Sequence, residues 1–86
     1  MPEISRFFGI VIKMFFDDHQ PPHFHAEYGG GEAIIEIYHL SVFAGRLSPR
    51  VTGFVIEWAT LHQDELMADW HRAQNQQPLQ KILPLE

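Results

Sequence analysis

Three histidines fall within seven residues in the segment 17–28, which reads DDHQPPHFHAEY. After Pro22 the side chains alternate in character, as they do along a β-strand whose successive residues point to opposite faces. On such a strand His23, His25 and Glu27 share one face, at steps of about 7 Å. Two imidazoles beside a carboxylate can bind a metal ion, transfer protons or hold an anion. This segment is therefore the candidate site of the chain.

A metal-binding interpretation takes His23, His25 and Glu27 as ligands, because zinc and non-haem iron use sets of two histidines and a carboxylate. Four further residues are near enough in sequence to complete the coordination shell: Asp17, Asp18, His19 and Glu36. The three ligands lie on one strand, however, and lack the helix-borne spacing of many metal motifs. We therefore expect no obligatory cofactor and keep a divalent metal, zinc or nickel, as the alternative.

An acid–base interpretation takes His23 and His25 as catalytic groups and Glu36 as the residue that orients His23. With Arg46 or Arg50 as a phosphate ligand, the chain would be a small ribonuclease. Its net charge of −5 and its six scattered Lys and Arg residues count against nucleic-acid binding, which needs a basic patch. In a third interpretation both histidines are surface groups that contact a partner or a helix. The sequence leaves all three interpretations open.

Length and composition limit the classes of protein to which this chain can belong. The 86 residues suffice for a single domain, 1–86, and the absence of cysteine excludes disulfides, thiolate zinc sites and cysteine nucleophiles. We find no apolar stretch that would span a membrane and no signal peptide, so we expect a cytoplasmic protein. Seven Phe and two Trp are a large apolar load for so small a domain. They predict a homodimer or a complex with a partner protein.

The hydrophobic pattern predicts an α+β fold, with an antiparallel sheet of three to four strands and one long C-terminal helix packed across it. Ser48 followed by Pro49 is typical of a helix start, with the serine as N-cap and the proline in the first turn. The expected strands are 6–16, 23–28, 32–38 and 42–44, the expected helix is 49–75, and 79–86 is a docked tail or an added edge strand.

A two-residue loop at Gly29 and Gly30 predicts the register of the central hairpin, because hairpins prefer two-residue turns rich in glycine. His23 then lies opposite Glu36, and Glu27 lies opposite Glu32. Only this register gathers the apolar residues of both strands on one face, because a shift by one residue exchanges the faces. The facing glutamates are unfavourable unless a cation lies between them.

The predicted helix has two apolar stripes that are rotated against each other near His62. Either the helix bends there, or it is straight and its two halves face different neighbours. We expect one continuous helix whose C-terminal half contacts something other than the sheet.

Four segments resemble a bacterial family, the domain of unknown function family 4160: MPEISRFFGIVI at the start, FFDDHQPPHFHAEYG at 15–29, GRLSPR at 45–50 and EWATLH at 57–62. The resemblance implies a small cytosolic protein that is often encoded beside, or fused to, a second small domain. It implies a two-protein complex, commonly suspected to be toxin–antitoxin-like. It marks His23, His25 and the proline pair as a family signature and assigns no catalytic residue.

The function expected from these observations is that of a protein-interaction module in a two-protein, toxin–antitoxin-like system. The alternative is a small His-dependent ribonuclease or a metal-dependent hydrolase. A basic cleft around the histidines would favour the enzyme, and an exposed apolar patch without a cleft would favour the interaction module.

Overall fold

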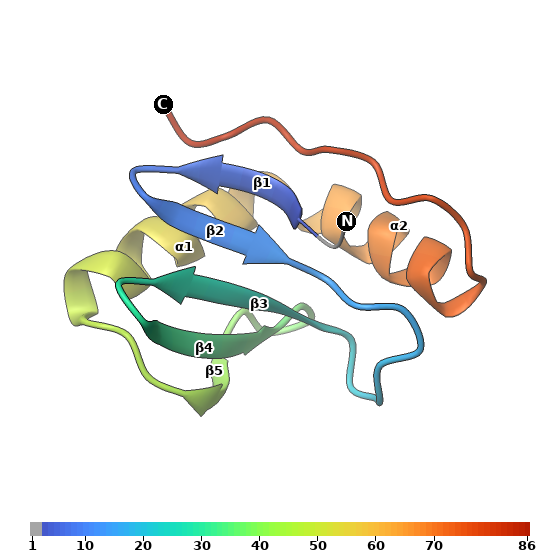
Figure 1. Cartoon of the computed structure of the whole chain (residues 1–86), viewed down its shortest axis with the longest axis horizontal. Helices are drawn as coiled ribbons and strands as arrows, with labels where there is room; N and C mark the ends of the chain where they lie inside the picture. The colour runs from blue at the N-terminus through green and yellow to red at the C-terminus, as the bar shows by residue number, and fades with distance from the viewer. Residues whose placement is uncertain (1–2) are drawn as a thin grey trace.

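A computed structural model describes residues 3–86, which form a five-stranded antiparallel sheet and two helices (Figure 1). The strands lie in the sheet in the order in which they follow along the chain. The elements are β1 (Glu3–Phe7), β2 (Ile10–Lys13), β3 (His23–Tyr28), β4 (Gly31–Glu36), β5 (Val42–Gly45), α1 (Pro49–Leu61) and α2 (Gln63–Gln74). The α+β class is confirmed, but the expected three to four strands and single helix are wrong in number. Neither helix of this described region is long and apolar enough to cross a bilayer.

The expected strand 6–16 is in fact a hairpin formed by β1 and β2. Phe7 pairs with Ile10 across a two-residue turn, in which Phe8 and Gly9 have φ values of 53° and 78°. Positive φ is ordinary for glycine and uncommon for phenylalanine. The Phe8 ring packs against Phe54 of α1, with centroids 5.1 Å apart. This contact helps to hold the turn, and nothing in the sequence around Phe8 indicates it.

The register expected for the β3–β4 hairpin is confirmed. His23 lies opposite Glu36 and Glu27 opposite Glu32, across a turn in which Gly29 and Gly30 both have positive φ. Most of the apolar face of the hairpin is fully buried in the core: Phe24, Ala26, Ala33, Ile35 and Ile37. Tyr28, expected on the same face, is 44% exposed at the end of β3. The opposite face carries the histidines.

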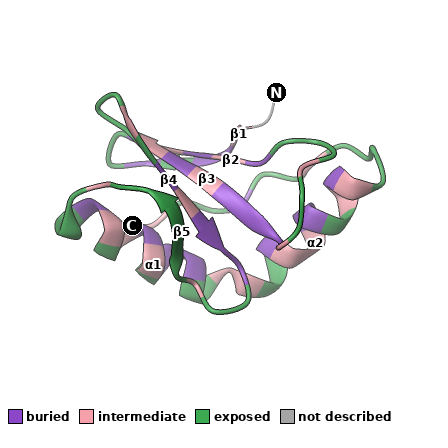
Figure 2. Cartoon of the chain, turned by 90° about the horizontal axis from the view of Figure 1, so that it is seen from below, coloured by how far each residue is buried: buried purple, intermediate pink, exposed green. Residues whose placement is uncertain are grey.

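Helix α1 begins as expected: the Ser48 hydroxyl accepts a hydrogen bond from the backbone N–H of Val51, at 3.3 Å. The expectation of one continuous helix is wrong, because His62 leaves helical geometry and separates α1 from α2. The rotation of the apolar stripe marks this break. The expected separate neighbour for the second half is also wrong, because Leu66 and Trp70 of α2 belong to the same core as the residues of α1. Figure 2 shows buried residues on the sheet and on both helices.

The segment 79–86 is a docked tail rather than a strand. It runs beside β1 (Figure 1), where the Ile82 N–H donates a hydrogen bond to the carbonyl of Ile4, at 2.8 Å. The Ile82 side chain is buried, and the indole N–H of Trp58 donates to the carbonyl of Leu83. The tail therefore covers the β1 edge of the sheet.

Candidate functional site

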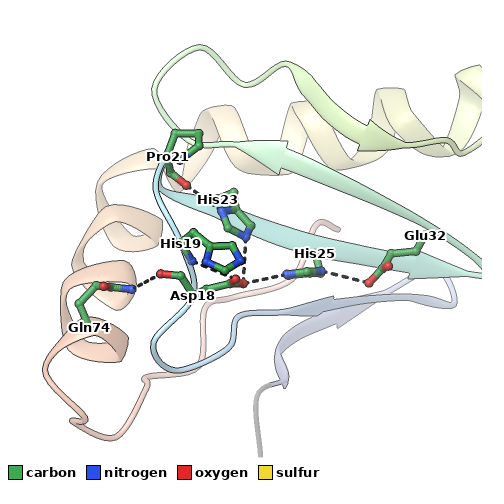
Figure 3. A network of polar contacts seen from close by, with 7 residues as sticks. All are labelled: Asp18, His19, Pro21, His23, His25, Glu32 and Gln74. Atoms are coloured by element: carbon green, nitrogen blue, oxygen red, sulfur yellow. Dashed lines mark hydrogen bonds and ion pairs between the residues drawn. The ribbon is translucent and has the colours of Figure 1, made fainter.

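Asp18, His23 and His25 meet at the end of the sheet where β3 begins (Figure 3). Strand alternation places His23 and His25 on the same face, and the loop between β2 and β3 returns Asp18 to them. The Nε2 atom of His23 lies 2.9 Å from Oδ2 of Asp18, and Nε2 of His25 lies 3.2 Å from the same oxygen. The two imidazoles thus converge on one carboxylate oxygen.

The other nitrogen of each ring has its own acceptor. Nδ1 of His23 lies 2.7 Å from the carbonyl oxygen of Pro21, and Nδ1 of His25 lies 3.1 Å from Oε2 of Glu32. A carbonyl and an ionised carboxylate only accept hydrogen bonds, so in both rings Nδ1 is the nitrogen that donates. Both Nε2 atoms are therefore directed toward Asp18: each donates to its carboxylate when the ring is protonated and turns a lone pair toward it when the ring is neutral.

Asp18 is itself held from two sides. The backbone N–H of His19 donates to its Oδ1, at 3.1 Å, which leaves Oδ2 for the histidines. The side chain of Gln74, on α2, donates to the backbone carbonyl of Asp18, at 3.0 Å. Burial acts to raise the pKa of Asp18, but the hydrogen bond from His25 and the charge of His23 outweigh it and lower that pKa. The ionised carboxylate is therefore the favoured form.

Aromatic side chains enclose the histidine pair. The His23 ring contacts Trp70 of α2 and Phe43 of β5, with centroids 5.3 and 6.3 Å away, and the edge of Phe15 meets the His25 ring at 4.7 Å. Only 5% of His23 is exposed. The surface position expected in the third interpretation is therefore wrong for His23, which is buried, but the helix contact that this interpretation allowed is present, because the ring packs on Trp70 of α2.

Glu36 lies opposite His23 in the register, yet its carboxylate is occupied elsewhere. It accepts hydrogen bonds from the backbone N–H groups of Tyr38 and His39 and lies 3.0 Å from Nδ1 of His39. The carboxylate that contacts His23 is Asp18. The orienting role expected for Glu36 therefore falls, in this geometry, to Asp18.

Glu27, the expected third metal ligand, forms an ion pair with Lys13, at 3.1 Å. The group of ligand atoms that the structure brings within 4.8 Å of one another is that of Asp18, His23 and His25. Asp18 is thus selected from the four residues that the sequence offered to complete the shell.

Of the two arginines expected as phosphate ligands, Arg50 lies toward the other end of β3. It lines a cavity together with Tyr28, the last residue of β3, and its guanidinium lies 5.8 Å from the centre of the Phe54 ring. The backbone N–H of Arg46 bonds to the carbonyl of Glu32, whose carboxylate contacts His25. Arg50 therefore does not support a phosphate site beside the histidines.

Sequence reasoning missed two supporting groups, the Pro21 carbonyl and the Glu32 carboxylate. Glu32 had a signal: in the predicted register it is the diagonal neighbour of His25, two residues from Ile34, and diagonal pairs on one face are within reach of long side chains. The Pro21 carbonyl had none, because its direction depends on the path of the loop.

Comparison with known proteins identifies a family and nothing closer. No curated protein and no solved structure matches the chain. Residues 9–71 match the profile of the family described as Domain of unknown function (DUF4160), and this stretch includes the whole Asp18–His23–His25 cluster. Because the match covers most of its length, the chain belongs to the DUF4160 family.

Proposed function

We propose that this domain is a protein-interaction module of a two-protein, toxin–antitoxin-like system in the bacterial cytoplasm, and that it binds its partner along β5. The observation that carries the proposal is the difference between the two edges of the sheet. The tail covers β1 with a backbone hydrogen bond to Ile4 and the buried side chain of Ile82. At the opposite edge every residue of β5 is exposed.

The β5 edge has the chemistry of a strand-binding surface. An edge strand offers unpaired N–H and C=O groups that can accept an added strand. Val42 and Phe43 are 44% and 56% exposed, and Tyr38 just before them is 62% exposed. Exposed aromatic side chains are typical of protein interfaces. The partner would supply an extended segment with alternating apolar side chains.

Two features of β5 suit a specific partner rather than indiscriminate pairing. The strand has only four residues, and its pairing with β4 is irregular between Ile34 and Ile35. Short and bulged edge strands resist uncontrolled edge-to-edge association. The partner must therefore match both the length and the distorted register of this edge.

The test is co-expression with the small protein encoded beside this gene, followed by purification and measurement of the mass of the complex. We expect a stable complex that Val42→Lys and Phe43→Lys abolish, because both side chains are exposed on β5. Leu61→Lys is the matched control, because Leu61 is 67% exposed at the end of α1. A complex that survives both β5 variants, or a homodimer without the neighbour that Val42→Lys dissociates, would contradict the proposed heteromeric partner.

A metal-dependent hydrolase is a second candidate, and the convergence of two histidines on Asp18 favours it. Two histidines and a carboxylate leave coordination positions open for water and a substrate. A metal-free ribonuclease is less well supported, since Arg50 lies beside Tyr28 at the other end of β3. Metal-dependent hydrolysis of model esters and phosphodiesters, lost in Asp18→Asn, would support the enzyme over the interaction module.

A further inference from the structure

We infer that Asp18, His23 and His25 form a binding site for a divalent transition-metal ion, with Oδ2 of Asp18 and the two Nε2 atoms as ligands. The inference does not rest on partner binding, because the three ligand atoms come from β3 and from the loop before it, and β5 contributes only the Phe43 ring that packs on His23. It follows from hydrogen-bond directions, spacing, supporting groups and surroundings.

The hydrogen-bond directions leave a gap that a cation fills. With each Nδ1 donating to Pro21 or Glu32, a neutral imidazole turns the lone pair of its Nε2 toward Asp18. Oδ2 of Asp18 also only accepts, yet it lies 2.9 and 3.2 Å from the two Nε2 atoms. Three acceptors this close repel one another unless positive charge lies among them.

Protonation of both imidazole rings would also place positive charge among the three atoms, but at a higher free-energy cost than one metal ion. Two imidazolium rings would then lie with centroids 5.3 Å apart in an enclosed site where the His23 and His25 side chains are only 6% and 13% exposed. Like charges in such surroundings repel, and each would be poorly solvated. A single divalent ion satisfies the carboxylate and both lone pairs at once.

The spacing of the three atoms matches a coordination sphere. Ligands at about 2.0–2.2 Å from a metal, separated by tetrahedral or octahedral angles, lie about 3.0–3.5 Å from one another. The two nitrogen-to-oxygen distances of 2.9 and 3.2 Å are close to this range, and all three atoms lie within 4.8 Å. Only small side-chain adjustments are needed to admit the ion.

The supporting groups are those that metal-binding histidines use in proteins. Such histidines donate their second ring N–H to a backbone carbonyl or a carboxylate, which fixes the tautomer and raises the basicity of the ligand. Pro21 does this for His23, and Glu32 does it for His25. The N–H of His19 on Oδ1 orients the third ligand in the same way (Figure 3).

The ligand set also indicates which metal would bind. Imidazole nitrogens favour zinc, iron, cobalt or nickel over Mg²⁺ and Ca²⁺, which prefer oxygen ligands. Three protein ligands leave at least one position for water or a substrate group. The aromatic rings of Trp70, Phe43 and Phe15 limit the access of solvent on the remaining sides.

The test begins with titration of untagged, chelator-treated protein with Co²⁺, monitored by the visible absorption of the bound Co²⁺. Zn²⁺ is then added to displace the Co²⁺ in competition. We expect one Co²⁺ per chain. Asp18→Asn and His25→Ala should weaken binding at least as strongly as Glu32→Gln. Glu32→Gln, which changes only a supporting group, should weaken it about 10- to 100-fold.

Glu27→Gln is the matched control, because Glu27 lies directly opposite Glu32 and pairs with Lys13 instead of a histidine. It should leave binding unchanged, as should His39→Ala and His71→Ala at exposed positions. The Glu32 side chain is 47% exposed, so its replacement should not unfold the domain, and circular dichroism verifies this. Absence of saturable binding, equal losses in the two glutamate variants, or loss only in the exposed-histidine variants would overturn the inference.

Discussion

The indole N–H of Trp58 donates a hydrogen bond to the backbone carbonyl of Leu83, at 2.8 Å, and thereby joins the fully buried face of α1 to the C-terminal tail. The tail also buries Ile82 and bonds to β1 through the Ile82 N–H. It is thus part of the folded core, although it contains no regular secondary structure.

Truncation of a buried side chain in the tail should destabilise the fold more than truncation of an exposed one. Ile82→Ala should lower the free energy of unfolding by about 2–4 kcal/mol, because it removes a buried aliphatic side chain. Leu83→Ala should change it by less than about 0.5 kcal/mol, because that side chain is 72% exposed and only its backbone carbonyl is used. Urea unfolding measures both, and equal effects would contradict the docked position of the tail.

Acid should weaken the fold partly through Asp18. Because the pKa of Asp18 is lowered in the folded state, its carboxylate stabilises the fold above the pKa of the unfolded chain. That stabilisation is lost as the pH falls through the lower, folded-state pKa. Asp18→Asn should therefore be less stable than the parent at neutral pH, and the difference should shrink below about pH 4.

Unfolding measured against pH in the presence of a chelator tests this expectation without metal. Asp17→Asn changes the same charge at the preceding exposed position, where φ is 58° and asparagine is well tolerated. It removes one carboxylate charge outside the Asp18–His23–His25 cluster and so serves as the control for the loss of charge alone. A constant difference for Asp18→Asn would show that the hydrogen bonds that Asp18 accepts from the histidines do not favour its ionisation.

Replacement of Glu36 should affect stability but leave metal binding intact. Its carboxylate, only 10% exposed, accepts hydrogen bonds from the N–H groups of Tyr38 and His39. Glu36→Ala should cost about 1.5–3 kcal/mol, as expected for bonds to a charged group. Urea unfolding and Co²⁺ titration together check this. A folded Glu36→Ala variant that no longer binds Co²⁺ would show that Glu36 contributes to the metal site.

Replacement of Gly45 and of Gly53 by alanine should change the free energy of unfolding in opposite directions. Gly45 has a φ of 73°, and an added Cβ would lie 2.3 Å from the carbonyl oxygen of Glu32, so Gly45→Ala should destabilise by about 2 kcal/mol or more. Gly53 lies in α1 with open space around the Cβ position, so Gly53→Ala should stabilise by about 0.5–1 kcal/mol. Thermal unfolding distinguishes the two, and destabilisation by Gly53→Ala would contradict the exposed position of that turn of α1.

The central hairpin could be predicted from sequence because two local signals agree. A Gly-Gly loop and a hydrophobic alternation that tolerates one register together place His23 opposite Glu36 and Glu27 opposite Glu32. The start of α1 at Ser48 was predictable for the same reason, because a cap and a proline occur in the expected order.

The features that sequence reasoning missed depend on contacts between distant segments. The Phe8–Gly9 turn is supported by Phe54 on α1, and a single glycine in a strand pattern equally suggests a bulge. The proximity of Asp18 to the histidines depends on the path of an irregular loop. The side chain of Gln74, on α2, holds this loop by a hydrogen bond to the backbone carbonyl of Asp18. No periodicity encodes such a path.

The order of the strands has a consequence for folding during synthesis. Each strand pairs with the one before it, so the sheet has low contact order and should assemble quickly as the chain leaves the ribosome. The hydrogen bond between Ile4 and Ile82 differs from this strand pairing, because it joins the edge of β1 to residues made much later. The edge of β1 should therefore stay open to aggregation until the tail emerges, so that the earliest of the five strands to be made is the last to have its edge covered.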